Sequence, residues 1–268
     1  MFLSCSYNFF NGEEHLIPSL KSVRNNIDYI TLVYQLKSNK GAPISKEALE
    51  AISYAKHNKL IDKIHIYTPD FSISPQENER NKRIIGLELA KSKGCTHFFS
   101  IDADEFYYGH ELKFAKDFIE KNKIEKTFCH SYMHLKSPRY RCLDTTNICF
   151  INKINKNSQI GNFPCTIPYV DPTRIIYTKQ GFISRLFKKD VYLFSTDQIA
   201  MYHMNFVRAD NLKSKLNNTS TNDTDFLVTI KNNVENWKPG DIFSFPGKGE
   251  FCFSEVKNDF NTFDNYSI

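Results

Sequence analysis

The stretch THFFSIDADEFY, Thr96–Tyr107, decides the fold predicted for this chain. Gly94 ends a helical pattern just before it, and His97–Ile101 has the composition of a short buried strand. Three carboxylates follow directly: Asp102, Asp104 and Glu105. Because ligands of open α/β sheets bind at the carboxyl ends of strands, the stretch predicts a functional site there. A D-x-D pair is also common in acidic surface turns, so the interpretation depends on the rest of the chain.

The hundred residues that lead to this stretch alternate between strand and helix patterns. Strands are predicted at Phe2–Tyr7, Tyr29–Gln35 and Asp62–Tyr67, and helices over residues 13–26, from Ser45 and from Ser74. The last helix has the clearest local signals, with Ser74 as N-cap, Pro75 in the first turn and Glu77 completing a capping box. Strands that alternate with helices predict an α/β fold with a mostly parallel sheet.

Beyond Tyr107 the pattern is less regular. It predicts a helix at Leu112–Lys121, strands near Lys126–Met133 and Asn147–Ile151, a loop over residues 152–161, short apolar runs at Val191–Phe194 and Ile199–His203, and a basic helix over residues 208–216. The tail from Trp237 onward is rich in Phe, Gly and Asn and has no strong periodicity. No repeat or low-complexity linker divides the chain, so we expect a single domain.

Composition narrows the class of protein. A chain of 268 residues with 41% hydrophobic residues can bury the core of one α/β domain. The net charge of +5 comes from scattered Lys and Arg, which argues against nucleic acid as the main partner and suits small anionic ligands or a peripheral membrane contact. The seven cysteines include no C-x-x-C pair, so neither a zinc knuckle nor a disulfide framework is indicated.

The same composition bears on location. The N-terminus lacks the basic start and long apolar run of a secretory signal, and no later stretch has the apolar length of a membrane span. Cysteines without a disulfide pattern fit a reducing compartment. We therefore expect a cytoplasmic protein.

Two motifs carry a resemblance to a known family. They are NERNKRIIGLELAKSKGCTHFFSIDADEFY, residues 78–107, and MYHMNFVRADNLKSKL, residues 201–216. Together with the strand–helix order, they resemble the bacterial, family 2-like glycosyltransferases of the GT-A fold over roughly residues 1–216. The resemblance implies a Rossmann-like, mostly parallel sheet flanked by helices, with a less regular C-terminal region. It implies one domain over 1–268, with a nucleotide-sugar-binding half at 1–108 and an acceptor-side half and tail at 109–268.

The resemblance also implies a metal site. In that family a Mn²⁺ or Mg²⁺ ion is held by the D-x-D carboxylates and, in many members, by a later His or Asp, so Asp102, Asp104 and His203 are the matching ligands here. Oxygen ligands suit these hard cations, and a bound cation neutralises the charge of a departing nucleotide diphosphate. His203 is flanked by Met201, Tyr202 and Met204, which fits a buried core histidine equally well.

Basic residues near both motifs are candidates for binding the diphosphate. These are Lys82, Arg83, Arg208 and Lys213. Each would also fit a solvated helix face, an interpretation that we favour for Lys82 and Lys213 and leave open for Arg83 and Arg208. Glu105 would support the two aspartates or contact the acceptor.

Nucleotide contacts are expected at the ends of the first two strands. The family often has an Asp after the second strand, and Gln35 takes roughly that place here. We therefore predict contacts from Gln35 and from the end of the first strand, around Tyr7.

An inverting transfer needs a carboxylate that deprotonates the acceptor hydroxyl. The Glu-Asp pair that is usual in the family is absent. Asp171, in the turn VDPTR that offers a carboxylate and the guanidinium of Arg174, is the first candidate, and Asp197 is the second. Either would also serve as a turn former or helix cap.

The resemblance implies a metal-dependent glycosyltransferase of hexosyltransferase type. It would move a sugar from a nucleotide-diphosphate donor to a carbohydrate or lipid-linked glycan acceptor, in the synthesis of a surface polysaccharide such as lipopolysaccharide or capsule, at the inner face of the membrane. One alternative is a non-catalytic nucleotide-sugar-binding protein. Another is a haloacid-dehalogenase-like phosphotransferase with Asp102 as nucleophile, although that family places its motif after the first strand and follows it with Thr or Val.

Overall fold

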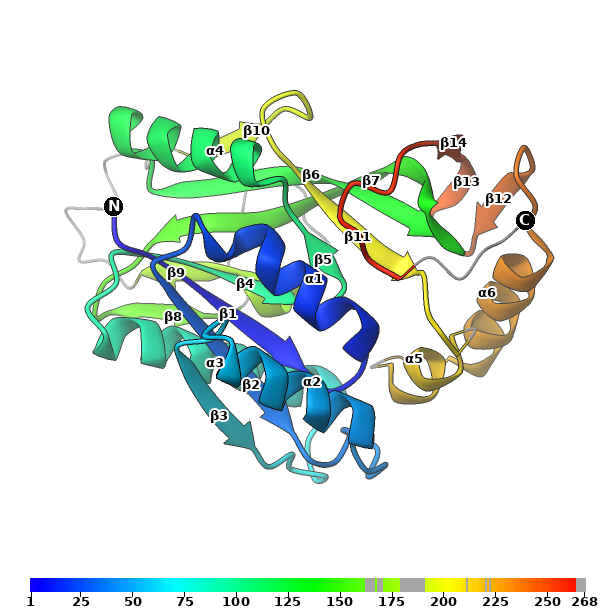
Figure 1. Cartoon of the computed structure of the whole chain (residues 1–268), viewed down its shortest axis with the longest axis horizontal. Helices are drawn as coiled ribbons and strands as arrows, with labels where there is room; N and C mark the ends of the chain where they lie inside the picture. The colour runs from blue at the N-terminus through cyan, green and yellow to red at the C-terminus, as the bar shows by residue number, and fades with distance from the viewer. Residues whose placement is uncertain are drawn as a thin grey trace.

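The computed structural model describes residues 1–161, 167, 171–178, 191–210, 212–219, 221 and 223–263. Its centre is a twisted ten-stranded sheet whose main path runs β3-β2-β1-β4-β7-β6-β11-β5 (Figure 1). The first four strands in that order are parallel to one another. They are β1 (Leu3–Phe9), β2 (Tyr29–Gln35), β3 (Lys63–Tyr67) and β4 (His97–Asp102). This half confirms the strand–helix alternation predicted from the sequence.

The second half of the sheet mixes directions. β7 (Ser137–Lys153) is antiparallel to both β4 and β6 (Lys126–Leu135), and β11 (Ala200–Phe206) is parallel to β6. Short strands complete this sheet: β5 (Glu105–Phe106), β10 (Val191–Phe194) and β14 (Ser254–Glu255). Five of the nine strand pairings described in this sheet are parallel, β1–β2, β1–β4, β2–β3, β6–β10 and β6–β11, so the mostly parallel α/β class is confirmed.

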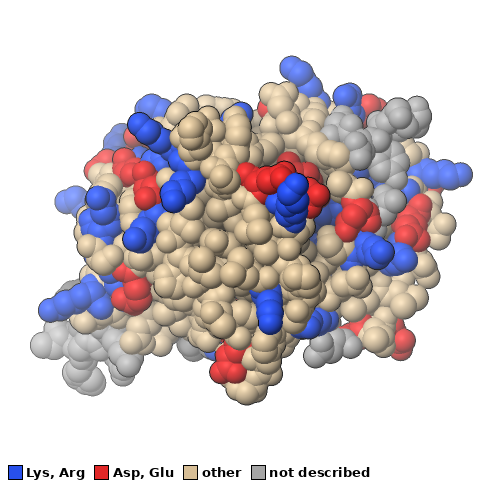
Figure 2. Space-filling view, turned by 60° about the horizontal axis from the view of Figure 1, so that its bottom comes forward, with Lys and Arg blue, Asp and Glu red and all other residues tan. Residues whose placement is uncertain are grey.

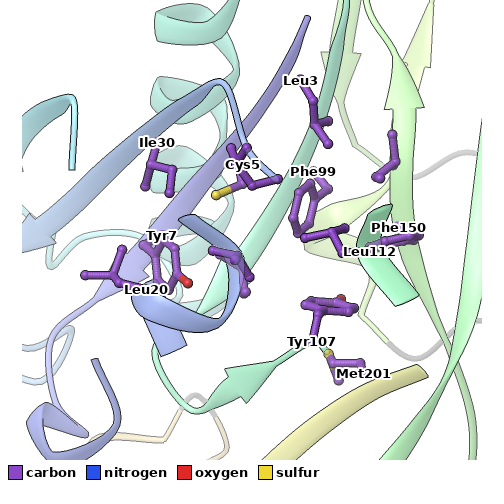
Figure 3. Close-up of a cluster of buried hydrophobic side chains, with 14 of the residues drawn as sticks. Leu3, Cys5, Tyr7, Leu20, Ile30, Phe99, Tyr107, Leu112, Phe150 and Met201 are labelled. Carbon is purple, nitrogen blue, oxygen red and sulfur yellow. The ribbon is translucent and has the colours of Figure 1, made fainter. Parts of the chain in front are cut away.

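Helices cover both faces of the parallel half. α1 (Glu13–Arg24), α2 (Lys46–His57) and α4 (Gly109–Asn122) pack in one large core with the odd-numbered residues of β1 (Figure 3). α3 (Pro75–Ser92) packs on the opposite face with Phe98 of β4 and with the small sheet of β8 (Ser158–Ile160) and β9 (Ile176–Thr178). Because side chains alternate along a strand, residues one apart in β1 face different layers.

The predicted start of α3 is confirmed. Ser74 accepts a hydrogen bond from the Glu77 backbone N–H, and Glu77 accepts one from the Ser74 backbone N–H. These two bonds satisfy N–H groups that the first turn of a helix leaves free. Gly94, at φ 79°, lies just beyond the helix end, where a left-handed residue stops the helix.

α3 approaches β1 closely at Gly86. A Cβ added at Gly86 would lie 2.1 Å from Ser6 Oγ and 2.4 Å from Ser6 Cβ. Ala in a helix interior is normally more stable than Gly by up to about 1 kcal/mol. Here we expect Gly86→Ala to lower the free energy of unfolding by about 1–3 kcal/mol, measured by urea denaturation, because overpacking displaces α3.

A matched substitution tests this reason. Gly109→Ala places a Cβ no closer than 3.4 Å to a neighbour, Asn26 Nδ2, and should change stability little. Ser6→Gly combined with Gly86→Ala should recover part of the loss. A Gly86→Ala variant as stable as the wild-type protein would show that the contact is not tight.

The C-terminal elements form a separate cluster at one end of the molecule, on the right of Figure 1. They are α5 (Lys213–Asn218), α6 (Thr224–Asn236) and the hairpin of β12 (Ile242–Phe245) and β13 (Gly249–Cys252). Trp237 and Phe243 anchor them on the ends of β6 and β7. The described part of the tail that lacks sequence periodicity, residues 237–263, contains this hairpin, which aromatic contacts hold in place.

Two sequence predictions are corrected in this half. The strand expected at Asn147–Ile151 is the end of the much longer β7, and the region expected to be a loop, 152–161, contains β8. The first half of β7, SPRYRCLDTT, is too polar to show a strand pattern, and its pairing with β6 stabilises it instead.

The surface agrees with the charge pattern of the sequence. Figure 2 shows acidic and basic side chains interspersed over the face in view, without a continuous basic patch. Within the described residues, no helix combines the length and apolar character that a bilayer crossing requires. The six described cysteines are all free.

Candidate functional site

A cleft of about 540 Å³ lies at the carboxyl ends of β1, β2 and β4. The side chains that line it come from both halves of the chain. α3 and the short 3-10 helix η1 (Pro172–Arg174) form one wall, and β11, α5 and the β12–β13 hairpin supply residues on the other side. The D-x-D carboxylates line the cleft, as the position of the motif at the end of β4 predicted.

Asp104 gathers three basic side chains. Its Oδ2 accepts hydrogen bonds from Arg208 and from Lys215 Nζ, the latter at 2.8 Å, and lies 3.4 Å from His203 Nε2. The Asp104 side chain is 9% exposed, and those of Arg208 and His203 are 4% and 25% exposed. We call these four residues the Asp104 cluster.

Backbone pairing explains why residues a hundred positions apart meet here. β5 follows the D-x-D motif and pairs antiparallel with β11, so Glu105 lies opposite His203. The Met204 N–H donates to the Asp104 carbonyl at 2.7 Å. The turn that carries Asp104 is therefore joined to the strand that carries His203.

Asp102 belongs to a second group, which Arg174 holds together. Arg174 donates to both oxygens of Glu105, at 2.7 and 2.6 Å, to Asp102 Oδ2 at 2.7 Å and to Asp171 Oδ2 at 2.9 Å. Arg83, from α3, donates to both Asp102 oxygens and to Thr173 Oγ1. We call Asp102, Glu105, Asp171, Arg83 and Arg174 the Arg174 cluster.

These contacts set the charge of the carboxylates. Burial raises the pKa of Asp104, but Lys215, Arg208 and His203 outweigh it and hold that pKa well below its usual range. Burial likewise raises the pKa of Asp171, and Arg83 and Arg174 more than offset it, so that its pKa is also lowered. Both aspartates are therefore ionised at neutral pH.

The cleft extends to the ends of β1 and β2, where amide side chains line it beside the ion pair of Lys82 and Glu79. Asn8 and Gln35 are 5% and 1% exposed, and the Asn8 Oδ1 and Gln35 Oε1 atoms are buried without a hydrogen-bond partner in the described structure. Glu79 and Asn39 join them through hydrogen bonds from Asn8 Nδ2 and Gln35 Nε2. Unpartnered buried acceptors are costly, so a ligand with N–H or O–H groups would bind favourably here.

The contact predicted for Tyr7 is wrong. Its side chain is fully buried beside Leu20 and bonds to Ser19 Oγ (Figure 3). Tyr7 pairs with Ile101 and faces the α1 layer, whereas the next residue, Asn8, pairs with Asp102 and faces the cleft. Gln35, the other predicted contact, does line the cleft.

The structure separates the two candidate bases. Asp171 lines the cleft and caps η1, with Oδ1 accepting from the Thr173 N–H and hydroxyl. Asp197 is exposed in the turn between β10 and β11 and does not line the cleft, so its proposed role is not supported. Its carboxylate bonds within its own turn, to Ser195.

The basic residues predicted to bind the diphosphate fall into two groups, those buried in the cleft and one that is exposed. Arg83 and Arg208 are buried in the cleft, and Lys82, expected on a solvated face, is buried there too and pairs with Glu79 at 2.8 Å. Lys213 is exposed, as expected. Sequence reasoning missed Lys215, two positions further on, and expected Arg174 on the surface of a turn. Arg174 lies in a region without a strong local pattern, whereas Lys215 lies in the basic helix expected over residues 208–216, which begins only at Lys213.

The three residues predicted to hold a metal ion are brought together only in part. In the region that the structure describes, no three His, Cys, Asp or Glu side chains are placed to hold one metal ion. Of the three predicted ligands, Asp102 pairs with Arg83 and Arg174 and not with the other two. Asp104 Oδ2 and His203 Nε2 are close enough to share a cation, which would replace the hydrogen bonds that Arg208 and Lys215 donate to the same Oδ2. Two ligands at right angles around an ion at about 2.1 Å lie about 3 Å apart, close to their separation of 3.4 Å.

Comparison with known proteins gives weak structural likenesses. No family model matches the chain, and no curated protein sequence matches it. A crystal structure of TarS from S. aureus aligns with a TM-score of 0.37 and 15% identity over 50% of this chain and 22% of that chain. TarS 1–349 in complex with UDP-GlcNAc aligns with a TM-score of 0.36 and 16% identity over 50% of this chain and 35% of that one.

A third likeness is to mannose-1-phosphate geranyltransferase from Thermus thermophilus, with a TM-score of 0.33 and 8% identity over 58% of this chain and 51% of that one. The alignments thus span between about a fifth and a half of these structures. We therefore base the functional assignment on the site itself.

Proposed function

We propose that this chain is a glycosyltransferase that binds a nucleotide-diphosphate sugar in the cleft and transfers the sugar to a carbohydrate acceptor. The observation that carries the proposal is the Asp104 cluster. It places one ionised carboxylate, one imidazole and two cationic side chains at the end of β4, beside a polar pocket with unpartnered acceptors. A nucleoside would fit that pocket, and a diphosphate would fit the cations.

The cations supply what the leaving group needs. Breaking the bond between sugar and diphosphate leaves negative charge on the phosphate oxygens, and fixed positive groups stabilise that charge. Arg208 and Lys215 converge on Asp104, and Arg208 Nε is buried without a partner in the described structure. In the Arg174 cluster, Glu105 and Asp171 hold Arg83 and Arg174 in place at the neighbouring wall.

Asp104 and His203 are the residues that would hold Mn²⁺ or Mg²⁺. When bound, the ion would supply further positive charge for the diphosphate. The resemblance noted in the sequence supports a carbohydrate or lipid-linked glycan acceptor, a role in surface polysaccharide synthesis and a position at the inner face of the membrane. The sheet of the first half and the joining of the two motifs in one cleft are consistent with that resemblance.

A panel of nucleotides tests donor binding. We expect one of UDP, GDP, CDP or TDP to raise the melting temperature in the presence of Mn²⁺, because a ligand that binds the folded state stabilises it. Nucleotide monophosphates should stabilise less, because they reach fewer of the cations. If no nucleotide diphosphate changes the melting temperature with or without metal, the proposal fails.

His203 gives a prediction about metal preference. Imidazole binds transition metals well, whereas Mg²⁺ prefers oxygen ligands. We expect the wild-type protein to bind the nucleotide more tightly with Mn²⁺ than with Mg²⁺, and His203→Ala to lower the Mn²⁺-supported affinity roughly tenfold more than the Mg²⁺-supported affinity. Calorimetric titration of the nucleotide with each metal measures both. Equal losses with both metals would argue that His203 is not a ligand.

The two alternatives predict different results. A non-catalytic binding protein would bind nucleotide sugars without releasing the nucleotide. A haloacid-dehalogenase-like phosphotransferase would form a covalent phosphate on Asp102, but both oxygens of that side chain are held by Arg83 and Arg174. Mass spectrometry of the intact protein after incubation with a phosphate donor detects such an adduct. We favour the transferase because Arg208 and Lys215 lie together at Asp104, where they can stabilise the charge of a departing diphosphate.

A further inference from the structure

We infer that Asp144 is the base that accepts the proton of the attacking hydroxyl, in an acceptor subsite formed by the bulge of β7 and the β12–β13 hairpin. The inference rests on the proposed function, and it assigns the place in the same cleft where the acceptor would bind. It begins from an irregularity in the sheet. His130 pairs with Asn147 and Tyr132 pairs with Leu143, so three residues of β7, 144–146, lie opposite the single residue Ser131.

Such a bulge redirects side chains, and bulges are common beside active sites. Here it presents polar groups to the cleft, where Ser131, Asp144 and Thr146 form part of the lining. The hairpin lies against the same place. Lys248 Nζ donates to both oxygens of Asp144, at 3.2 and 2.9 Å, and β14 joins the chain after the hairpin to Arg141 and Tyr140 of β7.

The position of Asp144 suits an acceptor. Met201 of β11 pairs with Ser131 of β6, and Ser131 lies opposite the bulge, so the three strands are adjacent. Adjacent strands are about 4.8 Å apart, so the backbone of Asp144 lies two strand spacings, about 10 Å, from the backbone of β11. This distance leaves room for the transferred sugar between a diphosphate at the Asp104 cluster and a hydroxyl at Asp144.

The other described carboxylates of the cleft have more hydrogen-bonding and ion-pair partners than Asp144 has. Asp102, Asp104, Glu105 and Asp171 are each bound by at least one guanidinium, and Glu79 is bound by Lys82, Asn8 and Asn39. Asp144 pairs with one ammonium group, that of Lys248, whose side chain is 25% exposed on the turn of the hairpin. Because Lys248 is partly exposed and lies on a turn, a hydroxyl can take its place at the Asp144 carboxylate.

Asp171, the base expected from the sequence, is less suited to that task. Arg83 and Arg174 lower its pKa, and a base whose pKa lies far below the working pH accepts a proton poorly. Both of its oxygens are already bound by groups of this chain. We therefore give Asp171 the role of holding Arg83 and Arg174 in position.

The step balances as an inverting displacement. The acceptor oxygen forms a bond to the anomeric carbon while its proton passes to the Asp144 carboxylate. The bond between that carbon and the diphosphate oxygen breaks, and the electron pair leaves with the diphosphate beside Arg208 and Lys215. Phe245 lines the same subsite, and the centroid of its ring lies 5.0 Å from Lys248 Nζ. Its ring offers an apolar face to the acceptor sugar.

Hydrolysis of the donor tests the inference without a known acceptor, because water is then the attacking group. UDP-glucose, UDP-GlcNAc, GDP-mannose and TDP-glucose serve as probes, and release of the nucleoside diphosphate is measured with Mn²⁺. We expect Asp144→Asn to lower the rate of the best donor by about 10²–10⁴-fold, the usual size of a general-base effect, with an unchanged nucleotide affinity. Asp144→Glu should retain more activity than Asp144→Asn.

Glu250→Gln is the matched control, because it removes one negative charge from the exposed side of the same hairpin. Its rate should equal that of the wild-type protein. NMR should show that the released sugar has the inverted configuration. An Asp144→Asn rate within threefold of wild type, or a retained configuration, would overturn the inference. A wild-type protein that neither binds nucleotides nor releases them would instead contradict the proposed function.

Discussion

Replacing Arg174 with Met should lower the free energy of unfolding by about 3–5 kcal/mol. Arg174 is 5% exposed and is the partner of three carboxylates, of which Glu105 is 2% exposed. Its loss would leave the Glu105 charge buried and without its ion-pair partner, and removing one member of a buried ion pair has a cost of this size. Chemical denaturation followed by circular dichroism measures the effect.

Lys113→Met is the control for this prediction. Lys113 pairs with Asp117 at 2.9 Å on α4, and both side chains are more than 60% exposed, so its loss should change stability by less than about 0.5 kcal/mol. Arg174→Lys should lie between the two, because an ammonium cannot make the paired bonds that the guanidinium makes to Glu105. If Arg174→Met is as stable as the Lys113→Met control, the Arg174 cluster does not organise the site.

The second large effect is expected from Asp104→Asn. We expect it to weaken Mn²⁺-dependent nucleotide binding by at least about 100-fold, because it removes the anionic ligand of the pair that would hold the metal. Asp102→Asn should weaken binding much less, because Asp102 bonds to Arg83 and Arg174 rather than to the Asp104 cluster. Calorimetric titration of both variants with the best nucleotide of the panel measures the difference.

This comparison has clear contrary outcomes. Equal losses in the two variants would restore Asp102 as a metal ligand, as the D-x-D motif alone suggested. Unchanged affinity in Asp104→Asn would remove the metal role from the Asp104 cluster. A melting curve for each variant without ligand shows whether a loss of affinity comes from a loss of fold.

The sequence predicted the parts of this molecule that local patterns determine. β2 has the predicted bounds, and α3 begins at the predicted cap, because apolar runs and a capping box are local signals. The position of Asp104 followed from the strand before it. Its neighbour His203 was predicted from the resemblance, and the pairing of β5 with β11 gives the physical reason that they meet.

Other features depend on contacts between distant segments. All seven residues of β1 are buried, so the strand shows no alternation from which to tell Tyr7, in the core, from Asn8, in the cleft. Arg174 looks like a surface residue in a turn until Glu105, 69 positions earlier, is seen beside it. The Asp144 subsite depends on a bulge that only the pairing of β6 and β7 creates.

Release of a nucleoside diphosphate from a nucleotide sugar is the most direct test of sugar transfer at this cleft. The wild-type protein should release it with Mn²⁺ from at least one of the four donors, EDTA should abolish the release, and Asp104→Asn should release at least about 100-fold less. A wild-type protein that releases nothing from any donor, or a release that neither EDTA nor Asp104→Asn reduces, would contradict the account.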